Sequence, residues 1–188
     1  MRKNWTALAL TGMLCLTTFA GIQTVSAETA DSAKQVDIVF THDTHSHLNT
    51  FTTIVDEAEK EVGGFARINT LIQEQKAKNP DTLVIDGGDF SMGTLIQTVF
   101  ETQAAEIRML GYMGCDVTTL GNHEFDYRSK GLANMLNSAT ESGDDLPALV
   151  VCNVDWESME AAGLSEGQQL IRDAFDEYGV SDYVVLEK

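Results

Sequence analysis

Residues 121–126 read Gly-Asn-His-Glu-Phe-Asp and follow directly on a short apolar run at residues 117–120. A run of this length is typical of a buried strand. The polar side chains behind it then lie at the carboxyl end of that strand. The stretch therefore predicts an α/β fold with functional side chains placed where a strand ends.

Two other polar motifs have the same placement. Asp43 and His45 follow an apolar run at residues 36–41, and Asp89 follows another at residues 82–86. Helix-like segments separate the three runs, as in a sheet of parallel strands. Ligands of such sheets bind outside the carboxyl ends of the strands, so we expect these oxygen and imidazole donors to converge on one crevice. Donors that converge in this way build two-metal hydrolytic sites, in which cations about 3.5–4 Å apart share a carboxylate.

Taken together, the three motifs resemble those of the calcineurin-like metallophosphoesterases. Asp43-x-His45, Gly88-Asp89 and residues 121–126 are similar to the first three motifs of that family. Residues 63–67 (Gly-Gly-Phe-Ala-Arg) narrow the resemblance to the branch of secreted bacterial 5′-nucleotidases, UDP-sugar hydrolases and 2′,3′-cyclic-nucleotide phosphodiesterases. The resemblance covers roughly residues 36–155. It implies an α/β fold, an incomplete metallophosphoesterase sandwich of mostly parallel strands with flanking helices, the first half of a four-layer α/β/β/α domain.

The resemblance also implies a set of metal ligands. Asp43 and His45 would hold a first divalent cation, Asp89 would bridge two cations, and Asn122 would hold the second. An amide oxygen suits the last position because it binds a cation without adding charge. Two divalent metal ions are expected as cofactors, and the sequence leaves Zn, Mn, Co and Mg open.

A catalytic role is implied for the next residues of the third motif. His123 would stabilise charge on the transferring phosphoryl group or protonate the leaving oxygen, and Asp126 would fix the tautomer and orientation of its ring. Glu124 and Phe125 are expected to shape the loop rather than to react.

Each of these residues has a structural alternative. An Asp at a strand end can cap the following turn, although three motifs in order favour the metal site. Family members usually have Asn at the position of His42, which leaves its role open, and for His42 and His47 a solvated position or a contact to a ligand is favoured over direct metal binding. Arg67 could contact a phosphate, but a structural ion pair is the favoured interpretation.

The remaining pattern extends the alternation of strands and helices. We interpret residues 44–62 as a loop, and Ile68, Leu71 and Ile72 as the apolar stripe of the helix that follows it. Met92, Met109 and Met113 are expected to fill the core. Helices are predicted at about sixteen residues from Gly63-Gly64, at 98–112, at 130–142 and at 168–178, with further strands at 148–152 and 183–186.

Residues 1–27 have the pattern of a secretory signal peptide. Arg2 and Lys3 precede an apolar stretch at 7–22, and Val-Ser-Ala at 25–27 is a cleavage pattern. The stretch is short for a spanning helix, which needs about 20 apolar residues; an uncleaved anchor is the alternative. We expect a linker at 28–35, the N-terminal portion of a metallophosphoesterase domain at 36–188, and a secreted, periplasmic or cell-surface location.

The charge of the chain limits its partners. There are 29 acidic and 12 basic side chains, for a net charge of −17. That field repels an extended nucleic acid, but not a small phosphate ester at a site where cations dominate. The expected partner is a small-molecule nucleotide or phosphodiester, with no nucleic acid, no stable membrane insertion after signal cleavage, and an open oligomeric state.

Two cysteines, Cys115 and Cys152, lie outside the predicted signal peptide. The first precedes one strand and the second closes the next, so parallel strands would hold them roughly 15 Å apart. A disulfide cannot span that distance. We expect two free and mostly buried thiols.

All four histidines of the sequence lie between residues 42 and 123. The family has further metal-binding histidines and a nucleobase-binding domain later in the chain, so this chain is expected to be a fragment that is inactive alone. Three functions stay open. The first is metal-dependent phosphate ester hydrolysis, by a 5′-nucleotidase or nucleotide phosphodiesterase. The second is a same-fold hydrolase such as a thiosulfohydrolase, and the third is an inactive fragment.

Overall fold

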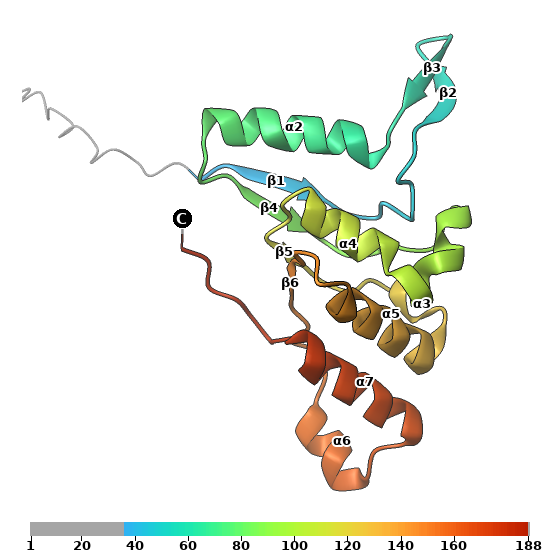
Figure 1. Cartoon of the computed structure of the whole chain (residues 1–188), viewed down its shortest axis with the longest axis vertical. Helices are drawn as coiled ribbons and strands as arrows, with labels where there is room; N and C mark the ends of the chain where they lie inside the picture. Colours follow the sequence, from blue (N-terminus) through green and yellow to red (C-terminus); the bar gives the residue numbers. More distant parts are fainter. Residues whose placement is uncertain (1–35, 188) are drawn as a thin grey trace, which may run out of the picture. The chain divides into compact units, whose positions relative to one another are not determined.

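A computed structural model describes residues 36–187 (Figure 1). The signal peptide predicted at 1–27 and the linker predicted at 28–35 lie outside the described residues. Among the residues that are described, no helix has both the length and the apolar character needed to cross a membrane.

Four parallel strands form the central sheet, in the order β1-β4-β5-β6. Phe40 pairs with Ile85, and Ile85 pairs with Val117. Because the strands are parallel, their carboxyl ends meet at one edge, and the predicted α/β class with a parallel sheet is confirmed. The strands are shorter than predicted, with these bounds: β1 (Ile38–Thr41), β4 (Leu83–Asp86), β5 (Val117–Thr118) and β6 (Ala148–Leu149).

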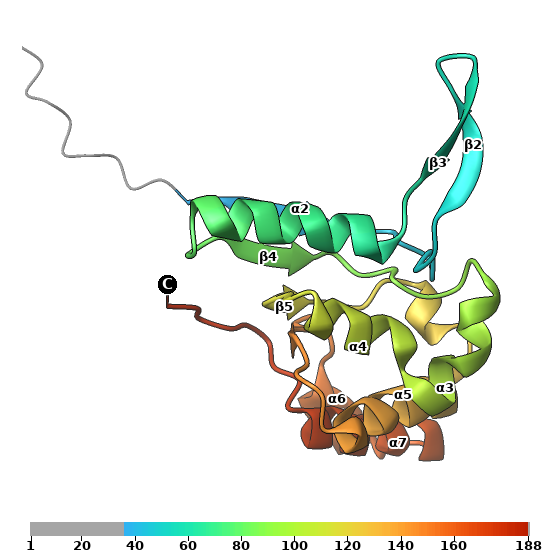
Figure 2. The same ribbon diagram turned by 45° about the horizontal axis from the view of Figure 1, so that its top comes forward.

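The helices flank this sheet, and Figure 2 shows α2 running alongside β4. Buried residues of α2, α4, α5 and α7 form one core with Val84 of β4 and Leu149 of β6. Helix α6 was not predicted from the sequence. The α-helices are α2 (Phe65–Lys78), α3 (Phe100–Gln103), α4 (Ala105–Tyr112), α5 (Arg128–Ser142), α6 (Trp156–Ala162) and α7 (Glu166–Tyr178). Two 3₁₀ turns accompany them, η1 (Leu95–Val99) and η2 (His123–Phe125).

The two faces of the sheet differ in burial. Val84 and Leu149 point into the core, whereas Ile38 and Phe40 on the opposite face are 55% and 59% exposed. Successive side chains of a strand point to opposite faces, so this alternation marks one face as helix-covered. The other face carries exposed apolar side chains on β1.

The loop predicted at residues 44–62 is wrong, because most of this segment is a β-hairpin. Strands β2 (Phe51–Val55) and β3 (Ala58–Val62) pair antiparallel and project away from the central sheet (Figures 1 and 2). Asp56 and Glu57 make the turn with positive φ angles of 53° and 63°, as two-residue hairpin turns require. The acidic run obscured the alternation of the flanking residues.

The single helix predicted at residues 98–112 is also wrong. The segment divides into the end of η1, then α3 and α4, with the break at Ala104. Ala104 is fully buried and left-handed, with a φ of 46°. The apolar spacing continues across the break, so the sequence pattern gave no sign of it.

The strand predicted at residues 183–186 does not form. After α7 the chain meets the edge of β6 only at Ser181, whose N–H donates to Leu149 O at 3.2 Å and whose carbonyl accepts from Val151 N at 2.9 Å. Residues 182–187 then have no regular structure. Strand β6 is only two residues long, so its edge offers little for a further strand to pair with.

Two expectations about single side chains, those for Leu71 and Cys152, need correction, and the others are confirmed. Ile72 is buried and Ile68 packs on the core as predicted, but Leu71 is 63% exposed because it lies on the outer side of α2. Both cysteines are free, as expected, yet only Cys115 is buried; Cys152 is exposed and lies beyond the end of β6. Met113 is buried, and Met92 and Met109 pack against the core.

Candidate metal centre

Three loops meet at the carboxyl edge of the sheet, one each after β1, β4 and β5. Backbone hydrogen bonds join the first two loops: Asp43 N donates to Gly88 O at 3.0 Å, and His45 N donates to Asp89 O at 3.1 Å. Ser46 N continues the ladder by donating to Phe90 O at 2.8 Å. The first two motifs are therefore brought together by main-chain bonds as well as by the order of the strands.

The backbone of these loops is strained. Asp43, His45 and Asp89 have positive φ angles of 51°, 44° and 55°, and Ser46 has 54°. A residue with a side chain in a sparsely populated backbone region costs on the order of 1–3 kcal/mol, and such residues cluster at functional sites. The surrounding hydrogen bonds must offset that energy for the loops to keep this form.

A glycine permits the closest approach between the second and third loops. A Cβ atom added at Gly121 would lie 2.2 Å from Asp89 Oδ1 and 2.6 Å from Asp89 N. No real side chain tolerates such contacts, so only glycine allows Asp89 to lie against the third loop. The glycine that opens the third motif therefore sets the position of the carboxylate from the second.

His45, Asp89 and His123 form a group that could hold a metal ion. One ligand atom from each lies within 4.8 Å of the others, and the rings of His45 and His123 meet edge to face with centroids 5.1 Å apart. Imidazole nitrogen and carboxylate oxygen are donors suited to Zn, Mn and Co. The donor set therefore fits a divalent cation.

Asp43 lies beside this group, with its Oδ1 3.9 Å from His45 Nε2. Its other carboxylate oxygen contacts His42 Nδ1. The hydrogen bond to His42 is the main cause that lowers the pKa of the Asp43 carboxyl, and nearby Asp89 and His45 lower it further. His42 thus holds Asp43 ionised, and its own ring contacts the carboxylate rather than the group of three.

Asn122 lies against Asp89, with one atom of its amide 3.2 Å from Asp89 Oδ2. If the nitrogen faces the carboxylate it donates a hydrogen bond, and the amide oxygen then accepts from His123 N at 3.3 Å. With its amide oxygen turned toward the site, Asn122 would offer an uncharged ligand to a divalent cation beside Asp89.

His123 and Asp126 make the contact that the sequence predicts. His123 Nδ1 and Asp126 Oδ2 are 2.8 Å apart, and this bond is the main cause that raises the pKa of His123. With Asp126 accepting from Nδ1–H, the Nε2 atom is left for another partner. The pairing fixes the orientation of the ring, as expected.

Sequence reasoning missed Glu106, which lies under the first loop. Glu106 is a buried residue of α4, and its Oε1 accepts a hydrogen bond from Ser46 Oγ at 2.7 Å, next to His45. Burial is the main cause that raises the pKa of its carboxyl. An acidic residue on the same helical face as Leu110 and Met113 was the signal that could have identified it.

The two remaining polar candidates, His47 and Arg67, make their contacts away from the group formed by His45, Asp89 and His123. His47 Nδ1 is 3.2 Å from Thr44 O, and its ring meets Phe51 of the hairpin. Arg67 donates to Glu61 Oε2 at 3.0 Å and to Gly63 O at 3.2 Å, which confirms the structural ion pair. Neither contact involves a predicted metal ligand.

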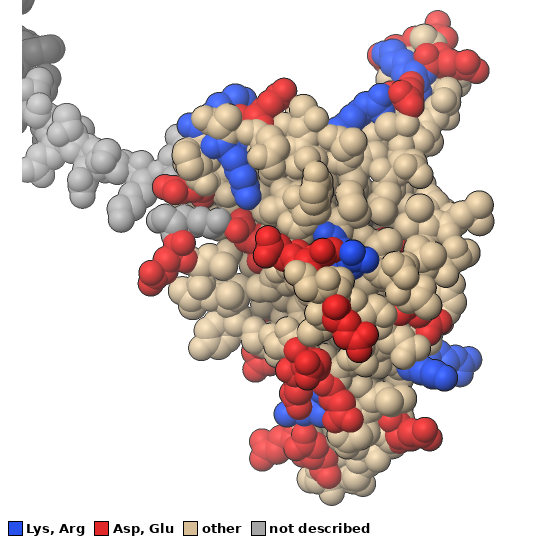
Figure 3. Space-filling view, in the orientation of Figure 1, with Lys and Arg blue, Asp and Glu red and all other residues tan. Residues whose placement is uncertain are grey.

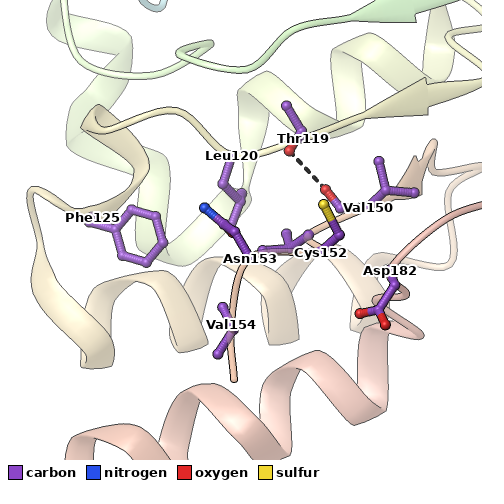
Figure 4. Close-up of a pocket in the computed structure, with 9 residues that line it drawn as sticks. Thr119, Leu120, Phe125, Val150, Cys152, Asn153, Val154 and Asp182 are labelled. Carbon is purple, nitrogen blue, oxygen red and sulfur yellow. Dashed lines mark hydrogen bonds between the residues drawn. The ribbon is translucent and has the colours of Figure 1, made fainter. Parts of the chain in front are cut away.

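Two cavities flank the site. One of about 270 Å³ opens beside Asp43 at the base of the hairpin. The other, of about 590 Å³, lies at the ends of β5 and β6, where Thr119 Oγ1 donates to Val150 O at 2.7 Å (Figure 4). Leu120 and Phe125 of the third loop line this larger cavity but none of the six predicted site residues does, so it adjoins the site rather than containing it.

Comparison with known proteins agrees with this geometry. The model of the family described as calcineurin-like phosphoesterase matches residues 36–183. The 5′-nucleotidase of Mus musculus is 36% identical over 110 residues, which cover 57% of this chain and 19% of that protein. A 5′-nucleotidase-related protein of Glossina morsitans morsitans is 29% identical over 184 residues, covering 94% of this chain and 32% of that protein.

Solved structures give the same result. The crystal structure of a 5′-nucleotidase precursor from Thermus thermophilus matches with a TM-score of 0.56 and 30% identity, over 65% of this chain and 23% of that one. The Haemophilus influenzae NAD nucleotidase matches with a TM-score of 0.54 and 27% identity, over 63% of this chain and 20% of that one.

The chain spans between 19% and 32% of the length of these two curated relatives. Within that span the family match covers nearly all of the described residues. The three motif loops, the parallel sheet and the family match lead to one conclusion: this chain belongs to the calcineurin-like phosphoesterase family.

Proposed function

We propose that this chain contributes a divalent metal centre for the hydrolysis of phosphate esters, with 5′-nucleotides or related phosphodiesters as the substrates. The observation that carries the proposal is the convergence of three strand ends, which brings the ligand candidates His45 and Asp89 together and places His123 beside them. The similarity to 5′-nucleotidases supports the substrate class.

In this proposal the ligand roles follow the three loops. Asp43 and His45 hold one cation, Asp89 lies between two, and Asn122 serves the second. Two bound cations would lower the pKa of an attacking water and offset charge on the phosphoryl oxygens. Asp89 suits the shared position because it contacts the third loop, where its Oδ1 accepts from His123 N at 2.9 Å.

His123 is proposed as the acid–base group and not as a ligand. Its Nδ1 is paired with Asp126, so Nε2 can donate to a phosphoryl oxygen or protonate the leaving oxygen. Asp126 acts only by holding the ring, so its loss should cost less rate than the loss of His123.

Metal content separates the two roles of His123. His123→Ala should keep the Mn²⁺ affinity of the unaltered chain, whereas His45→Ala should lose it. In an active preparation, His123→Ala should also lower the rate by about 10²–10⁴-fold. If His123→Ala loses the metal as completely as His45→Ala, His123 is a ligand and the assignment fails.

Turnover by this chain alone is proposed to be weak. A second cation would rest mainly on Asp89 and Asn122, and one carboxylate with one amide binds a divalent ion weakly without imidazole support. The test is to load the 188-residue chain with Mn²⁺ and assay AMP, UDP-glucose and p-nitrophenyl phosphate. Two bound metals and turnover of AMP in the usual enzyme range of about 1–10³ per second would contradict this expectation.

Any hydrolysis that is detected should depend on metal. EDTA treatment and Asp89→Asn should each abolish it, because EDTA strips the cations from the site and the substitution removes a carboxylate that would bind them. Activity that survives EDTA on both AMP and bis-p-nitrophenyl phosphate would contradict the metal-dependent mechanism.

The surface charge supports a small-molecule partner rather than nucleic acid. In Figure 3 the Asp and Glu side chains gather over α6 and α7 and at the tip of the β2–β3 hairpin, with few Lys and Arg among them. The net charge of −17 has the same sign as a nucleic acid backbone. Filter binding should show no retention of DNA or RNA at physiological salt.

We also propose export through the signal peptide at residues 1–27. Mass spectrometry of the protein from its source should then give a chain that begins at Glu28. Recovery from the cell interior of a chain that still begins at Met1 would contradict this proposal.

A further inference from the structure

Glu124 is completely buried inside the third motif, and both of its carboxylate oxygens are occupied. Oε2 accepts from Gly121 N at 2.6 Å and from Asp89 N at 3.0 Å. Oε1 accepts from Ser91 N at 2.9 Å and from Ser91 Oγ at 2.7 Å. One side chain therefore holds three backbone N–H groups and a hydroxyl.

These bonds join two loops that carry different parts of the candidate metal centre. Asp89 and Ser91 belong to the loop after β4, whereas Gly121 belongs to the loop after β5. The bond from His123 N to Asp89 Oδ1 also joins the two loops. Glu124 lies behind that contact and fixes the backbone on both sides of it.

Glu124 also holds a strained residue. Asp89 has a φ of 55°, and its N–H points at Glu124 rather than at another backbone group. Without an acceptor at this place, a backbone N–H in a strained conformation would lose its partner. The conformation that aims the Asp89 carboxylate at His45 and His123 thus depends on Glu124.

We propose that Glu124 is a positioning residue that sets the affinity of the site for divalent cations by holding Asp89 in register with Asn122 and His123. The proposal rests on the metal centre proposed above and deepens it. Glu124 does not touch the cations or the substrate; it acts through the backbone of Asp89 and Gly121.

The chemistry of the four donors requires a carboxylate. A glutamine has one acceptor oxygen and an NH₂ group with two donors. In Glu124→Gln one pair of the four donors would therefore face the donor side of the amide. The residue would keep its size but leave at least one of the three backbone N–H groups facing a donor, which weakens its hold on the loop after β4 or on both loops.

Glu106→Gln is a matched control, because Glu106 is also buried and also carries a carboxylate. Its Oε1 accepts a single bond from Ser46 Oγ, and its Oε2 has no hydrogen-bond partner among the described residues. An amide oxygen can accept the Ser46 bond equally well. The control removes a buried carboxyl group from beneath the site but leaves the loop contacts intact.

The experiment titrates Mn²⁺ into the 188-residue chain and both variants by calorimetry, and records the Co²⁺ absorption spectrum of each loaded protein. Removal of a group that supports a metal ligand typically lowers affinity by about 10–100-fold. We expect a loss in that range and a changed Co²⁺ spectrum for Glu124→Gln. Glu106→Gln should stay close to the unaltered chain in both measurements.

Circular dichroism of the metal-free proteins accompanies the titration. Should Glu124→Gln fail to fold, Ser91→Ala takes its place, since it removes one of the four donors and leaves the carboxylate; it should bind Mn²⁺ several-fold more weakly. Folded Glu124→Gln with unchanged affinity and spectrum, or unchanged Ser91→Ala where it is the substitute, overturns the inference alone. Failure of the unaltered chain to bind Mn²⁺ overturns the proposed function and the inference together.

Discussion

At the scale of single residues, the candidate site depends on close contacts between its loops. Gly121 and Asp89 touch so closely that the absence of a Cβ at position 121 is a condition for the site. Glu124 fixes the backbone on both sides of this contact by accepting from Asp89 N and Gly121 N. A glycine and a buried carboxylate thus do as much to form the site as the predicted ligands do.

Gly121→Ala tests this close approach. The new Cβ would meet Asp89 Oδ1 at 2.2 Å, so Asp89 must move and the affinity for Mn²⁺ should fall by roughly ten-fold or more. Overpacking of this kind also destabilises by about 1–3 kcal/mol. Calorimetry and urea unfolding give the two quantities.

Gly143→Ala is the control for an added methyl group that meets no neighbouring atom. Gly143 ends α5 with a φ of 71° and has nothing within 4 Å of an added Cβ. It should lower stability by about 1 kcal/mol, as a side chain in the left-handed region does, and leave Mn²⁺ binding unchanged. Equal affinities in Gly121→Ala and Gly143→Ala would show that the contact does not position Asp89.

The sequence could predict the side chains with recognisable chemistry but not those that hold them. His45, Asp89 and His123 were predicted to converge because they follow three apolar runs, and they do lie together. Glu106 was missed because its burial depends on how α4 packs beneath the first loop. A position relative to a neighbouring element is not written in local sequence.

At the scale of elements, α4 joins the core to the first loop through one carboxyl group. Glu106 lies on the buried face of α4 and accepts from Ser46 Oγ. Burial raises its pKa, the bond from Ser46 opposes that shift, and the charge of Glu124 adds to it. The folded protein therefore keeps a proton on Glu106 at pH values where the unfolded chain has lost it.

The raised pKa of Glu106 predicts how the stability of the folded protein changes with pH. A carboxyl whose pKa is higher in the folded state stabilises less as pH rises from its ordinary value through the folded one. Glu106→Gln removes this loss, so the variant should gain stability relative to the unaltered chain between about pH 5 and about pH 8. Urea midpoints at both values measure it, and a difference that is constant with pH would contradict it.

Buried Asp86 also has a raised pKa, caused mainly by burial. Its contribution to the pH dependence of stability is the same in the unaltered chain and in Glu106→Gln, because Thr41 and Thr118 hold it at the end of β4 in both. The comparison between variant and unaltered chain therefore isolates Glu106.

The sequence predicted an element correctly where a periodic apolar pattern packs against a partner in the fold. Helices α2, α5 and α7 were predicted within a few residues because each has an apolar face that packs on the core. The hairpin was missed because the acidic residues at its turn and along β3 interrupt the apolar pattern. The strand at residues 183–186 was predicted on a short apolar run, and no partner strand meets it within the described part of the chain.

At the scale of the whole described unit, one face of the sheet is open. Ile38 and Phe40 are more than half exposed, and Leu83, Ile85 and Val117 lie on the same face. Exposed apolar surface of this kind marks an interaction site or a route to association.

The open face predicts self-association of the chain. Sedimentation should show assemblies that grow with concentration, and the double variant Ile38→Thr/Phe40→Thr should reduce them. Leu71→Ser is the control, since Leu71 is equally exposed but stands alone on α2, and it should change nothing. A chain that stays monomeric at every concentration would refute this role for the face.

The proposed function rests on a divalent metal centre to which three strand ends contribute and in which Asp89 is the shared ligand. Calorimetric titration of Mn²⁺ into the 188-residue chain and into Asp89→Asn tests this most directly. Asp155→Asn is the charge-matched control, because Asp155 caps α6 by accepting from Ser158 N at 3.0 Å. We predict binding by the unaltered chain and by Asp155→Asn, and a loss of roughly ten-fold or more in Asp89→Asn. Equal affinity in all three proteins would contradict the account.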